Sequence, residues 1–158
     1  MIKNILITGG AGYIGSHISE LLIKNKKKVI IIDNLTTGFK RLINKKAKFY
    51  NVNILNRKKI RSIITKNKID SVIHLAGSLI IAEGEKFPKK YYKNNVIGSE
   101  QIILSCISST VKNFIFSSTA AVYKDGLYKV TEKSKVKPKS IYGKTKLKDE
   151  KIIIKHCK

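Results

Sequence analysis

A glycine-rich loop between an apolar segment and a segment of helical spacing constrains the fold more than any other feature. Residues 2–7 are expected to form a short buried strand, and residues 14–22 carry Ile and Leu at the intervals of an amphipathic helix. A dinucleotide pyrophosphate needs backbone N–H groups at a helix N-terminus, with no Cβ to block its approach. The sequence therefore predicts a dinucleotide-binding loop at residues 8–15, built on Gly9, Gly12 and Gly15.

Asp33 strengthens this prediction, because glycines spaced G-x-x-G-x-x-G are a weak signal alone. It ends a second apolar run, residues 29–32, and lies 18 residues after Gly15. A carboxylate at this place can accept hydrogen bonds from both adenosine ribose hydroxyls, and it repels the 2′-phosphate of NADP. We therefore expect NAD as the cofactor; the alternative is that Asp33 is an ordinary turn residue.

The formal charge of +23 would ordinarily indicate a nucleic-acid or membrane-surface protein. The charge is carried by 30 Lys and only 3 Arg, beside 27 Ile and 11 Asn, a bias spread along the whole chain. The basic clusters at residues 24–28, 57–61 and 133–139 lack the interleaved aromatics of nucleic-acid modules. Specific nucleic-acid binding is therefore the least favoured hypothesis, although the charge can steer an anionic ligand.

Other common site types find little support in the sequence. Cys106 and Cys157 are isolated, so we expect no metal site, and His17 and His74 are expected to pack or hydrogen-bond within the fold. No segment approaches the roughly 20 apolar residues of a membrane span, and no signal peptide precedes the first strand. These features favour a cytoplasmic protein.

Strand-like and helix-like segments alternate along the rest of the chain. Further strands are expected at residues 48–52, 71–75 and 114–116. Helices are expected around residues 60–64, after Pro88 with a stripe of Tyr92, Val96, Ser99, Ile103 and Cys106, and from Tyr142 onward. This alternation predicts an α/β fold of the Rossmann type, a doubly wound parallel sheet of about five strands in the order 3-2-1-4-5. Ligands of such sheets bind beyond the carboxyl ends of the strands.

Tyr142 and Lys146 are the candidate acid–base pair. They stand four residues apart at the start of the last helix, which places both side chains on one face. A free phenol has a pKa of about 10, so a phenolic base near neutral pH requires a nearby cation, such as an ammonium or a bound nicotinamide. Of the seven tyrosines only Tyr142 has Lys four residues on. The alternative is an exposed helix with a surface lysine.

Six motifs together resemble the extended short-chain dehydrogenase/reductases, and within them the UDP-glucose 4-epimerases more than the sugar-nucleotide dehydratases and decarboxylases. They cover essentially the whole chain in the family's order: TGGAGYIGSH (residues 8–17), DNL with a following glycine (33–38), VIHLAG (72–77), the segment 88–96, FSSTAAVY (116–123) and YGKTKLK (142–148). Two departures are Asn53, where family members usually have Asp, and Leu79, where the epimerases commonly have a cofactor-contacting Lys.

The resemblance implies NAD-dependent epimerisation at C4 of a UDP-hexose through a transient 4-keto sugar. It implies that Tyr142 is the base, that Lys146 holds the nicotinamide ribose and favours the phenolate, and that Thr119 binds the substrate oxygen. The residues matching the family's cofactor contacts are Gly9, Gly12, Tyr13, Ile14, Gly15, Asp33, Asn34, Leu35, Thr36, Thr37, Gly38, Asn53, Ile54, Leu75, Ala76, Gly77, Asn95, Tyr142 and Lys146.

Family members run to roughly twice the length of this chain, a size that ordinarily includes a second domain. We therefore expect residues 1–158 to form one incomplete NAD(P)-binding Rossmann-like domain, truncated before the last strands, with the C-terminal sugar-nucleotide-binding lobe absent. The expected partners are a UDP-hexose and either a second copy of the chain or a complementing C-terminal fragment. The alternative function is a non-catalytic NAD-binding module or a decaying remnant.

Overall fold

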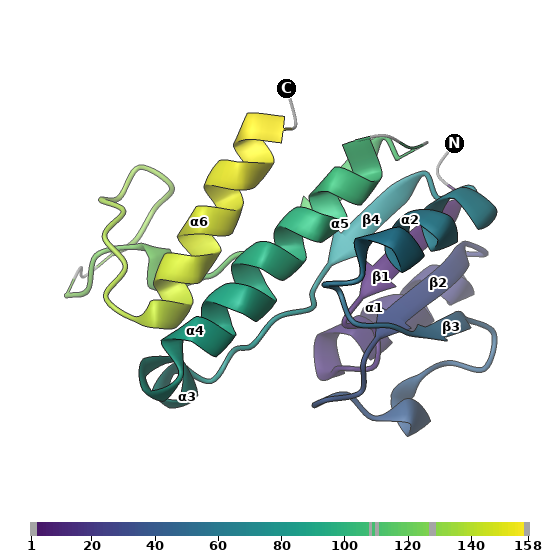
Figure 1. The fold of residues 1–158 in the computed structure, drawn as a ribbon, viewed down its shortest axis with the longest axis horizontal. Coiled ribbons are helices and arrows are strands. Elements are labelled where there is room, and N and C mark those ends of the chain that lie inside the picture. Colours follow the sequence, from purple (N-terminus) through teal and green to yellow (C-terminus); the bar gives the residue numbers. More distant parts are fainter. Residues whose placement is uncertain (1–2, 108, 110, 127–128, 157–158) are drawn as a thin grey trace. The chain divides into compact units, whose positions relative to one another are not determined.

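The computed structural model describes residues 3–107, 109, 111–126 and 129–156 (Figure 1). Ile2 and Cys157, which the sequence analysis mentions, lie outside these residues. The chain divides into two compact units, of which unit 1 comprises Met1–Ala76 and Gln101–Ser117, and unit 2 comprises Gly77–Glu100 and Ser118–Lys158. The expectation of a single incomplete domain stays a prediction.

Unit 1 contains a five-stranded parallel sheet. Its strands are β1 (Asn4–Thr8), β2 (Lys28–Asp33), β3 (Lys48–Asn51), β4 (Ser71–His74) and β5 (Asn113–Phe116). Their order in the sheet is β3-β2-β1-β4-β5, and every neighbouring pair is parallel. The predicted fold class and strand order are confirmed, and each strand lies within two residues of its predicted bounds.

Helices cover both faces of this sheet. Because side chains alternate along a strand, Leu6 of β1 points to one face while Ile5 and Ile7 point to the other. The Leu6 face packs against α2 (Arg57–Lys66) and the later residues of α5 (Gly98–Ile107). The opposite face packs against α1 (Tyr13–Lys24). Strands buried on both faces explain the continuous Ile and Val runs, since each buried aliphatic side chain contributes about 1.5–3 kcal/mol.

Unit 2 is built from helices around α6 (Ile141–His156) (Figure 1). Its other elements are α3 (Ile81–Lys86), α4 (Pro88–Tyr91), the π-helical segment η2 (Tyr92–Ile97), the start of α5 and the 3₁₀ turn η3 (Ala120–Val122). A second 3₁₀ turn, η1 (Lys40–Leu42), belongs to unit 1. The predicted helices after Pro88 and near Tyr142 are confirmed, whereas α3 was not predicted.

One position of the predicted stripe departs from the buried face of the long helix. Val96, Ser99, Ile103 and Cys106 are buried, but Tyr92 is 42% exposed and Tyr91 is the buried aromatic. The reason is the π-helical segment, which starts at Tyr92 and widens the turn, so that positions before it fall out of the regular 3.6-residue stripe. The Tyr91 hydroxyl donates to the Ile80 carbonyl oxygen at 2.5 Å, a contact that anchors it inside unit 2.

Among the described residues no helix is long and apolar enough to cross a membrane.

Candidate functional site

The glycine loop of unit 1 is a tight backbone structure that side chains would break. Gly9 has a φ of 72°, a left-handed conformation that favours glycine, and its N–H donates to the Ile32 carbonyl oxygen at 2.9 Å. A Cβ on Gly15 would collide with the Gly9 carbonyl oxygen and would lie 2.7 Å from the Gly10 Cα. The first turn of α1 therefore packs directly against the loop.

The N-terminus of α1 suits an anion. Its N-cap residue is Gly12, which has no side chain to accept a hydrogen bond from the first turn. The first N–H groups of a helix have no acceptor within the helix, and the helix dipole makes this end positive. Tyr13 and Ile14 follow with exposed fractions of 77% and 57%, so the rim of the loop is open to solvent. The loop fits the pyrophosphate of a dinucleotide.

Asp33 joins the end of β2 to this loop. One carboxylate oxygen accepts the Ala11 N–H at 3.0 Å, and the other accepts the Leu35 N–H at 2.8 Å. Leu35 has a positive φ of 60°, which is rare for a non-glycine residue, and the bond to Asp33 helps to hold it. Asp33 is thus 9% exposed and has a structural role that the sequence did not predict. Each oxygen keeps a second lone pair for a ligand hydroxyl.

The remaining predicted cofactor residues of unit 1 follow the carboxyl ends of β2, β3 and β4. Asn34, Thr36, Thr37 and Asn53 are exposed, Leu35, Gly38, Leu75 and Ala76 are half-buried, and Ile54 is buried in the core. The Phe39 N–H donates to the Ala11 carbonyl oxygen at 3.0 Å, which ties the segment after β2 to the glycine loop. All of these residues therefore gather at one end of the sheet, as parallel topology requires.

The two histidines expected to be structural are so. His74 is fully buried, and its Nδ1 lies 2.6 Å from the Thr8 hydroxyl, whose oxygen also accepts the Ala76 N–H. The His17 ring lies 4.6 Å from the Tyr13 ring at an interplanar angle of 52°, and its Nδ1 lies 2.8 Å from the Tyr13 carbonyl oxygen. Among the described residues no three His, Cys, Asp or Glu side chains are grouped to hold a metal ion.

The predicted catalytic residues lie in unit 2. Tyr142 and Lys146 stand on α6, whose first turn is capped by the Ser140 hydroxyl accepting the Gly143 N–H at 3.0 Å. Gly143 allows α6 to touch the η3 turn, because a Cβ there would collide with the Ala121 carbonyl oxygen. Thr119 caps this same turn by accepting the Ala121 N–H at 3.2 Å. The helix of Tyr142 and the turn of Thr119 are therefore packed together.

Asn95 links three segments of unit 2. Its side-chain oxygen accepts the Ser78 N–H at 2.7 Å, and its amide nitrogen donates to the Ser78 carbonyl oxygen at 3.0 Å and the Thr145 hydroxyl at 3.1 Å. The Thr145 hydroxyl in turn donates to the Tyr142 carbonyl oxygen at 2.7 Å. Asn95 is 1% exposed and both of its amide hydrogens are used within the protein. Its visible role is to hold the first turn of α6, and a direct cofactor contact stays a prediction.

Replacing Asn95 with Ala is expected to destabilise the protein by about 1–3 kcal/mol, because buried polar groups of Ser78 and Thr145 lose their partners. The free energy of unfolding in urea measures this. Asn94→Ala is the matched control, since it removes only a half-buried bond to the Ser78 hydroxyl and a long bond of 3.5 Å to the Asn95 side-chain oxygen, and it should cost less than about 1 kcal/mol. Equal effects of the two changes would contradict the linking role of Asn95.

Lys146 has a buried carboxylate on the same helix. Burial lowers the pKa of Lys146 to about 8, while the nearby Asp149 and Glu150 act in the opposite direction. Burial likewise raises the pKa of Asp149 to about 7, which the Lys146 charge offsets only in part. Asp149 was not predicted from the sequence, although its position three residues after Lys146 in a helix places the two side chains on one face.

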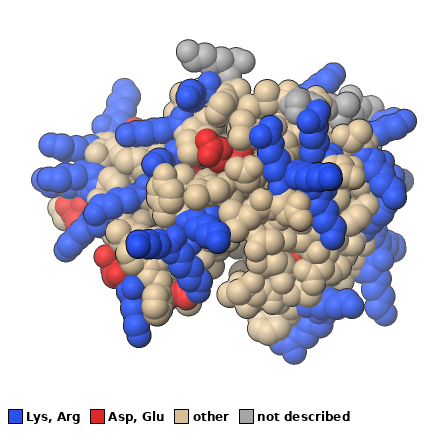
Figure 2. Space-filling model, in the orientation of Figure 1, with Lys and Arg blue, Asp and Glu red and all other residues tan. Residues whose placement is uncertain are grey.

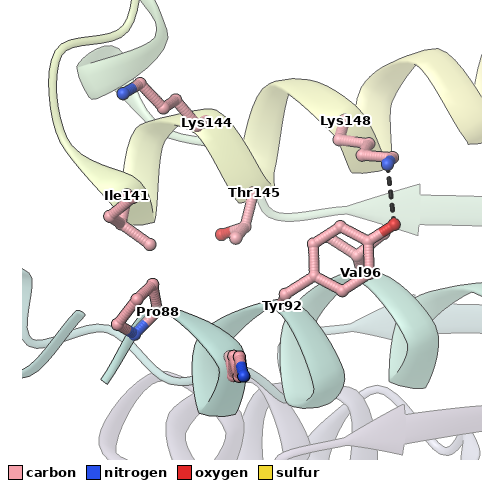
Figure 3. Close-up of a pocket in the computed structure, with 8 residues that line it drawn as sticks. Pro88, Tyr92, Val96, Ile141, Lys144, Thr145 and Lys148 are labelled. Carbon is pink, nitrogen blue, oxygen red and sulfur yellow. Dashed lines mark hydrogen bonds between the residues drawn. The ribbon is translucent and has the colours of Figure 1, made fainter. Parts of the chain in front are cut away.

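An apolar cavity of about 340 Å³ lies between α4–η2 and α6 (Figure 3). Pro88, Tyr92 and Val96 line one side, and the Lys148 Nζ donates to the Tyr92 hydroxyl across its end at 2.7 Å. The eight lining residues include Thr145 but neither Tyr142 nor Lys146. The cavity is therefore separate from the predicted catalytic pair.

Basic side chains are spread over the visible face of the molecule and few carboxylates lie among them (Figure 2). The exposed ion pairs, such as Lys24 with Glu20 at 3.3 Å, contribute little to stability because solvent screens them.

The sheet and the glycine loop define a Rossmann-type nucleotide-binding protein. Residues 5–158 match the model of the NAD dependent epimerase/dehydratase family, and the chain belongs to that family. The UDP-glucose 4-epimerase of Lactobacillus helveticus is 40% identical over 152 residues, which are 94% of this chain and 46% of that protein.

Solved structures show the same relationship. The UDP-glucose 4-epimerase from Brucella ovis in complex with NAD matches with a TM-score of 0.94 and 33% identity, over 98% of this chain and 48% of that one. The enzyme from Thermotoga maritima with UDP-glucose matches with a TM-score of 0.90 and 35% identity, over 98% and 52%. The chain thus spans about half the length of these relatives.

Proposed function

We propose that this chain is the NAD-binding half of a nucleotide-sugar 4-epimerase. The observation that carries the proposal is the N-terminus of α1, with glycine at its N-cap, beside the Asp33 carboxylate, in a chain of the epimerase/dehydratase family. In unit 1 the loop at Gly9, Gly12 and Gly15 would hold the pyrophosphate, and Asp33 would accept from the ribose hydroxyls. When bound, NAD would take up the hydrogen of the sugar C4 as hydride and return it to the other face of the sugar.

In unit 2 the proposed roles follow the resemblance residue by residue. Tyr142 would take the proton of the sugar 4-hydroxyl, and the Lys146 ammonium would favour its phenolate and bind the nicotinamide ribose. The Thr119 hydroxyl keeps its own proton to donate, because its oxygen is the acceptor for the Ala121 N–H. It would therefore hydrogen-bond the substrate oxygen.

The proposed substrate is a UDP-hexose, by analogy with relatives named UDP-glucose 4-epimerase. The proposed protein partner is a second copy of the chain or a fragment that supplies the C-terminal half. Light scattering of the chain alone, and mixed with the C-terminal half of a relative, distinguishes these partners.

Calorimetric titration of the chain with NAD and NADP tests the cofactor proposal. We expect NAD to bind at least about tenfold more tightly, because the Asp33 carboxylate repels the 2′-phosphate. Asp33→Asn should reduce this preference, since the amide keeps the size of the side chain, loses its charge and keeps one of the two oxygens that accept the Ala11 and Leu35 N–H groups. Equal affinities of the unchanged chain for the two cofactors would contradict the role of Asp33.

A second candidate is an NAD-binding module without turnover, since the glycine loop and Asp33 lie in unit 1, whereas the predicted catalytic residues belong to unit 2. Conversion of UDP-galactose to UDP-glucose is measured for the chain alone and with the C-terminal half of a relative. Turnover in either preparation supports the epimerase. NAD binding with no turnover in both preparations supports the module.

A further inference from the structure

We propose that Asp149 is a positioning residue for Lys146, a buried counter-ion that keeps the Lys146 ammonium charged. The inference rests on the proposed function for its catalytic meaning, because Lys146 is the residue that would act on Tyr142 and the cofactor. No family motif found in the sequence includes Asp149.

The geometry places the two charges in one buried cluster. Asp149 follows Lys146 by three residues on α6, so their side chains leave the same face of the helix. Asp149 is 0% exposed and Lys146 is 7% exposed, although both are ionisable. A buried charge is tolerated only when an opposite charge or hydrogen bonds replace the lost water.

Among the described residues, few groups other than Lys146 could compensate the buried charge of Asp149. The Ser99 hydroxyl of α5 acts on the same carboxyl, but neither Asp149 oxygen meets the geometry of a hydrogen bond with any described residue. Glu150 is the third charged group acting on the pair, and its carboxylate is held by the Ser118 hydroxyl. Lys146 is therefore the charge that compensates the buried Asp149 carboxylate.

The Asp149 carboxylate in turn affects the protonation of Lys146. Burial alone drives a lysine toward its neutral form, and a neutral amine cannot stabilise a phenolate. The Asp149 carboxylate opposes this loss and keeps Lys146 protonated at higher pH. Burial lowers the pKa of Lys146 to about 8 and raises the pKa of Asp149 to about 7, so the two charges coexist over a narrower pH range than they would in water.

The pH behaviour has a definite sign. As the pH falls through about 7, Asp149 takes up a proton and Lys146 stays charged without its counter-ion. As the pH rises through about 8, Lys146 loses its proton and can no longer support the Tyr142 phenolate. Removing the Asp149 charge should therefore shift the loss of the Lys146 proton to lower pH.

The test uses the full chain with Asp149→Asn, which keeps the side-chain size and removes its charge. NMR of ¹³C-labelled lysine follows the Lys146 Cε signal against pH, assigned by its absence in Lys146→Met. We expect the pKa of Lys146 to fall by about 1 unit or more in Asp149→Asn. Asp125→Asn, the same change at an exposed carboxylate, is the matched control and should leave it unchanged. An unchanged Lys146 titration in Asp149→Asn would overturn the proposal.

A reciprocal measurement covers the case in which Asp149→Asn fails to fold. In Lys146→Met, the pKa of Asp149 followed by its carboxyl ¹³C signal should rise above its value in the unchanged chain, because its counter-ion is gone. A carboxyl that titrates at the same pH in both proteins would also overturn the pairing. Neither readout needs NAD, so a chain whose Lys146 titration shifts as expected but which does not bind NAD would refute the proposed function and leave the ion pair standing.

Discussion

Gly15→Ala is expected to destabilise the protein by about 3 kcal/mol or more and to abolish NAD binding. Helix propensity alone predicts the opposite sign, since Ala is favoured over Gly within a helix by up to about 1 kcal/mol. Steric overlap outweighs this preference. The added Cβ would collide with the Gly9 carbonyl oxygen and would lie 2.7 Å from the Gly10 Cα. These are backbone atoms that cannot rotate away, which places the cost at the upper end of that for overpacking. The free energy of unfolding in urea, measured for both proteins, gives the sign of this change.

Gly12→Ala is the matched comparison within the same loop. Its Cβ would lie 3.3 Å from the Gly9 carbonyl oxygen, a contact that a small shift relieves, and its φ of −81° suits any residue. We expect a loss of less than about 1 kcal/mol in stability, as for Gly replaced by Ala at an N-cap. The binding of NAD should still weaken, because the new methyl group stands at the mouth of the loop. Equal destabilisation by the two changes would refute the close packing of Gly15.

Tyr142→Phe is expected to reduce epimerase turnover by about 10²–10⁴-fold, the usual contribution of a positioned acid or base. The change removes only the phenolic oxygen, so the affinity for NAD and the unfolding free energy should stay close to those of the unchanged chain. Turnover is measured with UDP-galactose in the preparation that shows activity, alone or with a complementing C-terminal half.

Tyr92→Phe provides the control for this loss. It removes the same oxygen from the same helical unit, but at a hydroxyl that bonds Lys148 beside the apolar cavity. Turnover in Tyr92→Phe should remain within a few-fold of the unchanged chain. Comparable losses in both variants would point to a general disturbance of α6 and would remove the support for Tyr142 as the base.

The sheet was predictable because its signals are local and mutually consistent. Apolar runs of four to six residues, separated by helical segments, leave a parallel sheet as the solution that buries them on both faces. The strand order then follows from right-handed crossovers. The position of Tyr92 was not predictable in this way, because a π-helical turn changes the spacing of side chains without a distinctive composition.

Within the candidate site, too, the residues in one local sequence unit were predictable, and those that depend on tertiary packing were not. The glycine loop and Asp33 belong to one strand-loop-helix-strand unit, so a short stretch of sequence is enough to predict that they lie together. Asn95, by contrast, acts through Ser78 and Thr145, which are 17 and 50 residues away. Such a link depends on packing, so a single sequence shows the residue without its partners. Helical spacing places Asp149 on the same face as Lys146, but only the structure shows that its carboxylate is buried.

Asp33 has a consequence for any attempt to re-engineer the cofactor preference. Its two oxygens shape the loop through Ala11 and Leu35, so a substitution that admits the extra phosphate of NADP also releases two backbone groups. In a library that varies position 33 alone, selection would mainly recover variants that still fold, rather than variants that prefer NADP. Productive variants should carry a second change, at position 35 or in the segment after it, that restores the turn by other means.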